Sequence, residues 1–364
     1  MNDIVRTLIT IVLFFGILGI LVLIHEVGHF VVARLFRVRV LEFGVGFPPR
    51  AKVLRDQGET VYTLNWLLPI GGFVRLEGED GDAGDDPRSF VAQPLWRKLV
   101  ILLAGVAMNL ALAFVIFTGI TLTGDPAIGY RIGLVEAGSP AAAAGLQAGD
   151  VIERVDGRFF GAFGPGDIIG DIRSKAGTTV SLTVRRGDGT LEVPANLRSQ
   201  ADVDAGRGAL GVGALASVTT SDRVTYSPAA AVDLGLQRTV SATSLIIDGV
   251  GQLVEGIVQR PTEPPLAQGP VGIATGIGDV FFALGPTITL YLAGFLSANL
   301  AVVNILPFPP LDGGRMLMLV IKRFAGERLS LRAERLTYFV GFAMLLLFLV
   351  WVTAFDIARG LGGG

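Results

Sequence analysis

The chain has 364 residues, of which 51% are hydrophobic and 17% are charged. A soluble domain has about a quarter charged residues, so this composition points to membrane spans. The net charge of −2 gives no reason to expect nucleic acid as a partner. The chain has no cysteine, which excludes disulfides, thiolate metal sites and a cysteine nucleophile, and it has two histidines.

Four charge-free stretches are long enough to cross the hydrocarbon core of a bilayer, which takes about 20 helical residues. The first is not expected to be a cleaved signal peptide, because no small-residue cleavage site follows it and it leads directly into a cluster of ionisable residues. The stretches are residues 7–24, 99–124, a part of 280–311, and 336–355.

Lysine and arginine gather after the first span, at the start of the second, and between the third and the fourth. Basic residues near span ends favour the cytoplasmic side, and all three flanks can be cytoplasmic together. The sequence therefore predicts that the N-terminus, residues 125–280 and the C-terminus are outside.

The segments between the spans differ in composition. Residues 37–95 read as a cytoplasmic-side loop with a β-hairpin, and residues 125–198 as a small soluble domain of short strands. Residues 199–280 read as a linker over 199–226 followed by an interfacial amphipathic helix over 229–258. The predicted helical segments are 1–36, 96–124, 281–321 and 336–358, with a cytoplasmic loop at 322–335.

His25-Glu26-Val27-Gly28-His29 has the HExxH pattern, and it contains both histidines of the chain. On a helix, positions i and i+4 lie on one face, so the two imidazoles can bind one zinc ion. Glu26 is then placed to take a proton from metal-bound water. A polar patch at a helix end is the competing interpretation, but ionisable side chains at membrane depth usually mark function.

A zinc site needs a third protein ligand, which must be Asp or Glu because no other histidine and no cysteine exist. Asp312 is the strongest candidate, since it is the first charge after a 32-residue uncharged run. The prolines before it break the helix and allow Asp312 to turn inward. The alternative is that Asp312 is an N-cap of the next helix.

These two motifs together resemble the site-2 protease family of intramembrane zinc metalloproteases, in particular its bacterial RseP-like members. That family pairs HExxH with NxxPxPxLDG, and the resemblance implies one zinc ion per chain, bound by His25, His29 and Asp312, with Glu26 as the catalytic base. Residues 43–47 and 69–75 resemble the family's membrane-associated β-loop. Residues 269–273 resemble its GPVGI segment, and residues 104–109 resemble its AGPxxN segment with Val106 in place of proline.

The resemblance implies a multi-span α-helical membrane protein of about four transmembrane helices, with the β-loop and one inserted extracytoplasmic α+β PDZ domain. Residues 139–157 look like the core of that domain, which binds an extended peptide along a sheet edge. A non-binding spacer or lid is the alternative. By resemblance, the peptide edge is expected at Ile128, Gly129, Tyr130 and Ile132.

The resemblance also implies regulated intramembrane proteolysis in the bacterial inner membrane, with the active site toward the cytoplasmic side. The implied substrates are single-span membrane proteins, such as anti-sigma factors and remnant signal peptides, after a first cut outside. We expect the unwound substrate to add as a strand to the loop at residues 60–76, and Asn299 and Asn304 are equally consistent with polar contacts between helices. The predicted substrate-binding residues are Asn299, Asn304, Pro307, Pro309, Gly72 and Phe73.

Two other classes of protein compete with this interpretation. A transporter or metal-ion carrier could use the same ligands, but it would need ionisable residues along several spans, and the apolar runs of the second and fourth have none. A catalytically inactive PDZ scaffold is disfavoured because the HExxH and LDG motifs are both intact.

Overall fold

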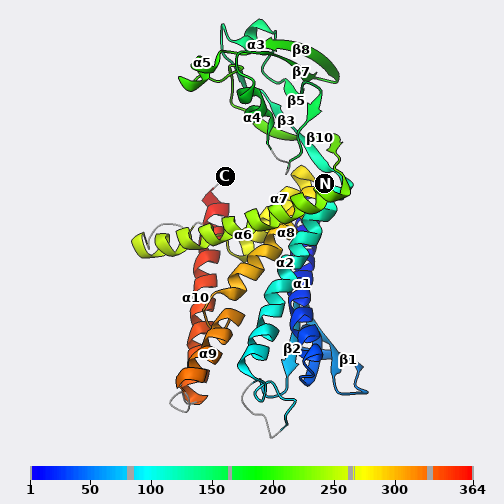
Figure 1. The fold of residues 1–364 in the computed structure, drawn as a ribbon. Helices are drawn as coiled ribbons and strands as arrows, with labels where there is room; N and C mark the ends of the chain where they lie inside the picture. Colours follow the sequence, from blue (N-terminus) through cyan, green and yellow to red (C-terminus); the bar gives the residue numbers. More distant parts are fainter. Residues whose placement is uncertain are drawn as a thin grey trace. The chain divides into compact units, whose positions relative to one another are not determined.

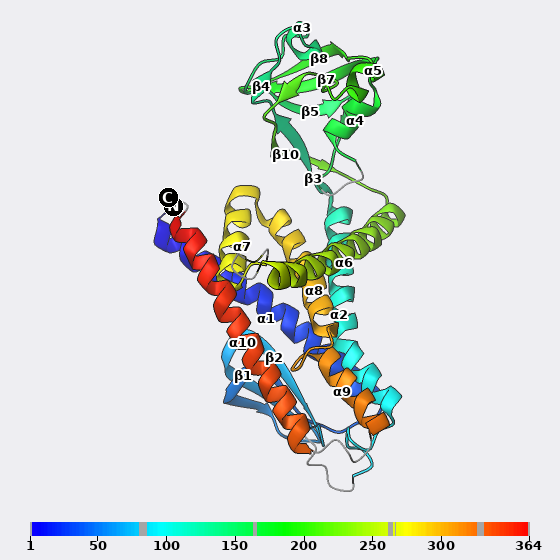
Figure 2. The ribbon, with the colours of Figure 1, turned by 90° about the vertical axis from the view of Figure 1, so that its left-hand side faces the viewer.

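The computed structural model describes residues 2–79, 86–162, 166–260, 265, 267–325 and 331–362. The chain divides into two compact units (Figures 1 and 2). The helical unit comprises Met1–Phe117 and Leu236–Gly364, and the sheet unit comprises Thr118–Gly235.

Four of the described helices are long and apolar enough to cross a membrane. They are α1 (Asp3–Leu35), α2 (Leu95–Thr123), α8 (Pro286–Ile305) and α10 (Leu331–Gly362), the last with its apolar part at Glu334–Arg359. The prediction of about four long apolar helices is therefore confirmed.

The prediction of one helix over residues 281–321 is wrong, because this region contains parts of three helices. The helix α7 (Pro270–Leu284) ends at Gly285, whose φ of 83° favours glycine, and Pro286 begins α8. A turn rich in proline then separates α8 from α9 (Asp312–Ala325). The break at the prolines is the one that the sequence predicts, and Asp312 is the first residue of α9.

A small antiparallel sheet of β1 (Val40–Arg55) and β2 (Val61–Leu76) lies beside the C-terminal half of α1 in both views (Figures 1 and 2). The first half of β1 pairs with both halves of β2, so Gly44 lies between Thr63 and Phe73. A Cβ on Gly44 would lie 2.2 Å from the Phe73 ring, which explains the glycine. The second half of β2 is consequently an outer strand of this sheet.

The helix α6 (Pro228–Gln259) covers the predicted amphipathic segment, and its part in the helical unit runs across the long helices instead of alongside them (Figures 1 and 2). Its apolar side chains Ala242 and Ile246 pack in one buried cluster with residues of α2 and α8. The rest of that buried cluster is Ala113, Phe117, Ala298 and Val302.

The sheet unit is built on a six-stranded sheet with the order β10-β3-β5-β7-β8 and with β6 paired to β5. Its core contains apolar side chains from both the strands and the short helices. The elements are β3 (Asp125–Arg131), β4 (Leu134–Val135), α3 (Pro140–Ala143), β5 (Val151–Val155), β6 (Arg158–Phe159), α4 (Ile168–Ser174), β7 (Thr179–Arg186), β8 (Gly189–Asn196), α5 (Gln200–Asp204), β9 (Val212–Gly213) and β10 (Ala216–Val224).

The linker predicted over residues 199–226 is not a linker, because it contains α5, β9 and β10. The strand β10 is at the edge of the sheet and pairs with β3. An edge strand can be rich in Ser and Thr, since one of its sides is not covered by another strand. Polar composition alone therefore does not distinguish an edge strand from a linker.

The predicted peptide edge is also wrong, because β3 lies inside the sheet. Ile128, Gly129 and Tyr130 pair with β10, and Tyr130 pairs with Ile152 of β5 on the other side. The N–H of Ile132 donates to the carbonyl of Asp150 at 2.7 Å. A peptide therefore cannot add to this strand without displacing β10 or β5.

Candidate metal centre

Three ionisable side chains from two distant parts of the chain meet inside the helical unit. His25 and His29 lie one turn apart on α1, and Asp312 is the first residue of α9. Each is buried, and their ligand atoms all lie within 4.8 Å of one another. We call His25, His29 and Asp312 the metal cluster, since it could hold a metal ion.

The spacing of the three ligand atoms fits zinc. The Nε2 atoms of His25 and His29 are 3.1 Å apart, and they lie 2.9 and 3.3 Å from Oδ2 of Asp312. Ligands about 2.0–2.1 Å from a tetrahedral zinc ion are about 3.3 Å from one another. The metal cluster therefore has both the donor types and the mutual distances of a three-ligand zinc site.

Two glycines after Asp312 allow the chain to fold back sharply onto the end of α8. A Cβ on Gly313 would lie 2.1 Å from the carbonyl oxygen of Ile305, and one on Gly314 would lie 2.5 Å from the backbone of Phe308. Any larger residue would push α9 away from the turn. The LDGG sequence thus positions Asp312 as well as supplying the carboxylate.

Gly105 of α2 leaves room for the two imidazoles. A Cβ at this position would lie 2.5 Å from Nε2 of His29 and 2.7 Å from Cε1 of His25. Gly28 of α1 faces the same helix, where its Cβ would lie 2.4 Å from the carbonyl oxygen of Ala104. The two glycines together let α1 and α2 approach closely at the metal cluster.

The backbone of α2 also orients one histidine. Nδ1 of His29 lies 2.8 Å from the carbonyl oxygen of Ile101, so an Nδ1–H donates there. In the neutral ring this hydrogen bond leaves Nε2, the atom that faces His25 and Asp312, without a proton and able to bind a metal.

Glu26 is half-buried and is held by the β-sheet. Its carboxylate accepts a hydrogen bond of 3.1 Å from the backbone N–H of Val74 in the outer half of β2. Gly72 lies next to it, since a Cβ there would be 3.8 Å from Cγ of Glu26. The structure therefore brings Gly72 close to Glu26, and Phe73 follows on the same strand.

The two asparagines predicted to bind substrate are not hydrogen-bond partners of the metal cluster within the described part of the chain. The amide of Asn304 donates to the carbonyl of Leu300 one turn earlier in α8, and Asn299 is half-buried in the same helix. Pro307 is exposed and Pro309 half-buried in the turn between α8 and α9.

An ion pair that the sequence did not suggest ties the sheet to α9. The guanidinium of Arg315, one turn after Asp312, donates to the carboxylate of Glu79, which follows β2. Glu79 also accepts from the backbone N–H of Leu76 at 3.0 Å. This pair joins residues 236 positions apart, and no local pattern could have indicated it.

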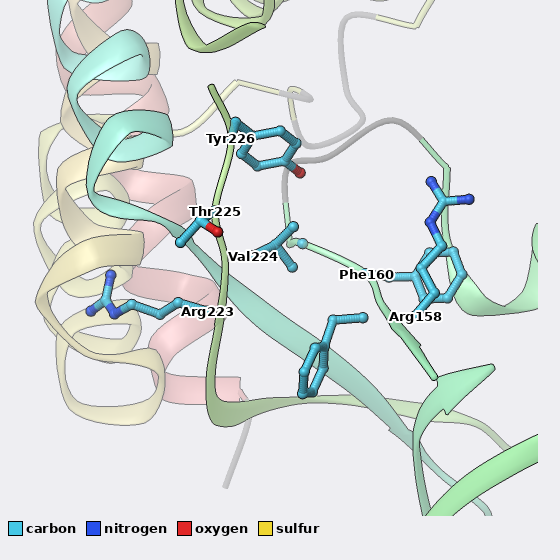
Figure 3. A pocket seen from close by; sticks show the side chains of 8 residues that line it. Arg158, Phe160, Arg223, Val224, Thr225 and Tyr226 are labelled. Carbon is cyan, nitrogen blue, oxygen red and sulfur yellow. The ribbon is translucent and has the colours of Figure 1, made fainter. Parts of the chain in front are cut away.

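The sheet unit contains a cavity of about 380 Å³ formed by residues 158–161 and 223–226 (Figure 3). The guanidinium of Arg158 lies 5.2 Å from the centre of the Phe160 ring. The described residues that line this cavity include no His, Asp or Glu. The described lining therefore offers no His, Asp or Glu side chain to a metal ion.

Four helices able to span a membrane, an HExxH helix and a buried carboxylate at zinc-binding distance define a membrane-embedded zinc metalloprotease. The sequence profile of peptidase family M50 matches residues 13–348, so the chain belongs to this family, that of the site-2 proteases. It is accordingly a zinc metalloprotease and a multi-pass membrane protein.

Individual relatives agree with this assignment. The chain is 27% identical to the regulator of sigma-W protease RasP of Bacillus subtilis (strain 168), over 96% of this chain and 98% of the relative. It is 28% identical to the zinc metalloprotease RasP of Shouchella clausii, over 96% and 99%. A protein of Nostoc sp. (strain PCC 7120) that carries a zinc metalloprotease name is 32% identical over 91% of each chain.

Proposed function

We propose that the protein is an intramembrane endopeptidase that cleaves single-span membrane proteins after a first cut on their outer side. In this proposal His25, His29 and Asp312 are the zinc ligands, and Glu26 is the general base. The observation that supports this proposal most strongly is the buried metal cluster, with Glu26 on α1 between the two histidines of the cluster.

The proposed chemistry divides between the metal and the protein. Bound zinc supplies a Lewis acid that polarises a carbonyl and acidifies water. Glu26 takes a proton from the attacking water and returns it to the leaving amide nitrogen. The hydrogen bond from Val74 restricts the rotation of the Glu26 carboxylate, which favours a fixed direction of proton transfer.

The outer half of β2 is the proposed binding edge for the unwound substrate. Successive N–H groups of a strand point to opposite sides, and those of Val74 and Leu76 donate to Glu26 and Glu79. The N–H of Gly72 therefore points to the same side. A substrate that pairs there keeps its backbone groups satisfied at membrane depth and comes next to Glu26. Phe73, Asn299, Asn304, Pro307 and Pro309 remain predicted contacts.

The substrates we propose are membrane-anchored anti-sigma factors and remnant signal peptides. The Bacillus subtilis relative is named as a regulator of sigma-W, which supports the first class. We propose the bacterial inner membrane as the location, with the metal cluster toward the cytoplasmic side and the sheet unit outside. Basic residues follow the first span, begin the second and lie between the third and the fourth, and such residues favour the cytoplasmic side.

We propose that the sheet unit is the extracytoplasmic PDZ domain and that it limits access of substrates with bulky outer parts. The covering of β3 on both sides favours this role over peptide capture at the predicted edge. Peptide capture would require another surface of the unit.

The test is cleavage of a tagged single-span reporter by the purified protein in proteoliposomes. We expect cleavage that a chelator abolishes and that added zinc restores, and we expect a reporter with a large outer domain to resist. Cleavage that continues in the chelator at full rate would contradict the proposed zinc chemistry.

A further inference from the structure

Asn109 of α2 is fully buried beside the metal cluster. Its side-chain Nδ2 lies 3.3 Å from Nδ1 of His25, and its Oδ1 is buried without a hydrogen-bond partner among the described residues. The hydroxyl of Ser297 in α8 donates to the backbone carbonyl of Asn109 at 2.8 Å. The backbone at this position is thus anchored, while one hydrogen bond, to His25, holds the amide.

The position of the proton on the His25 ring determines whether the Asn109 side chain must donate or accept a hydrogen bond. Nε2 of His25 faces both His29 and Asp312, so it is the atom that would bind the metal and it cannot carry a proton. The proton of the neutral ring is then on Nδ1, which becomes a donor. A donor Nδ1–H would face the donor NH2 of Asn109, and this arrangement is repulsive.

A half-turn of the terminal amide removes this conflict. The oxygen and nitrogen of an asparagine amide have nearly the same size and are assigned from their hydrogen bonds. Among the residues that the structure describes, no other hydrogen bond of the side chain opposes the exchange, since Oδ1 has no partner there in its present position. After the exchange, Oδ1 lies about where Nδ2 is now and accepts from Nδ1–H of His25.

We infer that Asn109 is a positioning residue that accepts the Nδ1–H of His25 and holds its Nε2 ready for zinc. The inference rests on the proposed assignment of His25 as a metal ligand. With this hydrogen bond, α2 positions both histidines from one helix face. Ile101, Gly105 and Asn109 follow one another at intervals of four on that face. Ile101 accepts from His29, Gly105 leaves space, and Asn109 accepts from His25.

The test is the zinc affinity of the purified full chain in detergent, measured by competition with a chromogenic chelator. Loss of a supporting hydrogen bond to a metal-bound histidine weakens binding about 10–100-fold, and we expect this for Asn109→Leu. Asn109→Asp keeps an acceptor but has no donor, so we expect zinc affinity within about threefold of wild type or tighter. Asn65→Leu removes another fully buried amide from the helical unit and should leave zinc affinity unchanged.

The two variants separate the acceptor role from a merely structural one. Wild-type affinity in Asn109→Leu would overturn the inference while leaving the zinc site intact. A loss in Asn109→Asp as large as in Asn109→Leu would show that the amide acts as a donor, and would also overturn it. If Asn109→Leu does not fold, Asn109→Asp is compared with wild type alone: zinc affinity within about threefold supports the acceptor role, and a loss of about tenfold or more overturns it. A wild-type protein that binds no zinc would instead contradict the proposed metal centre itself.

Discussion

The backbone N–H of Val74 donates a 3.1 Å hydrogen bond to the carboxylate of Glu26, 48 residues earlier in the chain. The bond joins the outer edge of the β-sheet to the glutamate of the HExxH motif. A substrate strand that pairs along this edge would therefore run toward the proposed general base. The register of that pairing would then determine which peptide bond of the substrate lies at Glu26.

Glu26→Gln should abolish cleavage and preserve the metal. The amide oxygen can still accept from Val74, but it cannot take a proton, so we expect a fall in kcat of at least about 10²–10⁴-fold. The measurement pairs reporter cleavage in proteoliposomes with zinc content by mass spectrometry. Cleavage at the wild-type rate would remove Glu26 from the proposed mechanism.

Asp312→Ala should remove zinc. A direct ligand is lost, so zinc affinity should fall by more than the roughly 100-fold that the loss of a supporting hydrogen bond can cause. Asp356→Asn is the matched control, since Asp356 is a buried carboxylate of the same unit that accepts from the backbone N–H of Gly272 at 2.8 Å. Zinc-to-protein ratios after dialysis compare the two, and equal retention would contradict the assignment of Asp312.

Gly105→Ala should weaken zinc binding by steric contact alone. The added methyl group would lie 2.5 Å from Nε2 of His29, so the imidazoles must move. Changes that disturb the orientation of a metal ligand lower metal affinity about 10–100-fold, and we expect a loss of zinc affinity of about tenfold or more. Gly16→Ala adds the same group to α1, where no atom of the described residues lies within 4 Å. Chelator competition should give Gly16→Ala the wild-type value, and a wild-type value for Gly105→Ala would refute the steric argument.

The sheet unit should lose stability in acid through Asp150. The Arg186 guanidinium, which donates to both Asp150 oxygens at 2.7 Å, holds the pKa of that carboxyl below its ordinary value of 3.8. A depressed folded-state pKa stabilises the fold above pH 3.8, and this contribution is lost as the pH falls through the folded pKa. We expect the urea midpoint to fall between pH 6 and pH 3, and to fall less in Asp150→Asn.

That midpoint can be followed in the full chain. The chain has no cysteine, so an environment-sensitive dye on Thr190→Cys would report on the exposed end of β8 in the sheet unit alone. Asp188→Asn, at an exposed position of the neighbouring turn, should show the same pH dependence as wild type. An equal fall in Asp150→Asn and wild type would rule out the Asp150–Arg186 pair as the cause.

The residues of the metal cluster could be predicted because their chemistry leaves few choices. The spacing of His25 and His29 puts them on one helix face, and the chain has no other histidine or cysteine to compete. The uncharged run before Asp312 then singles out that carboxylate. The structure brings the three together, although Asp312 is 287 residues from His25.

The surroundings of the metal cluster could not be predicted in the same way. The contacts of Gly105 and Asn109 depend on how α2 is rotated against α1, and a single sequence does not contain that angle. The pairing of Glu79 with Arg315 depends on where β2 ends relative to α9. The AGVAMN segment can be recognised in the sequence, whereas its contacts with the two histidines cannot.

Three errors of the sequence interpretation have two separate physical causes. The Gly-, Ala-, Ser- and Asp-rich composition of residues 199–226 predicts a linker, yet the same composition is compatible with the edge strand β10, which has no further strand on its outer side. Because β10 covers β3, the predicted peptide edge is closed. The helix break at Gly285 lies inside the uncharged run of residues 280–311, and a run without charges predicts one continuous span.

The wide separation of the ligands along the chain has a mechanical consequence. An ion bound by α1 and α9 together would cross-link His25 and Asp312, which are 287 residues apart and otherwise interact through a hydrogen bond. Closing a long loop restricts the chain, so a cross-link of this kind stabilises the closed arrangement even without catalysis. Chelation should then lower the melting temperature of the inactive Glu26→Gln variant as much as that of the wild type.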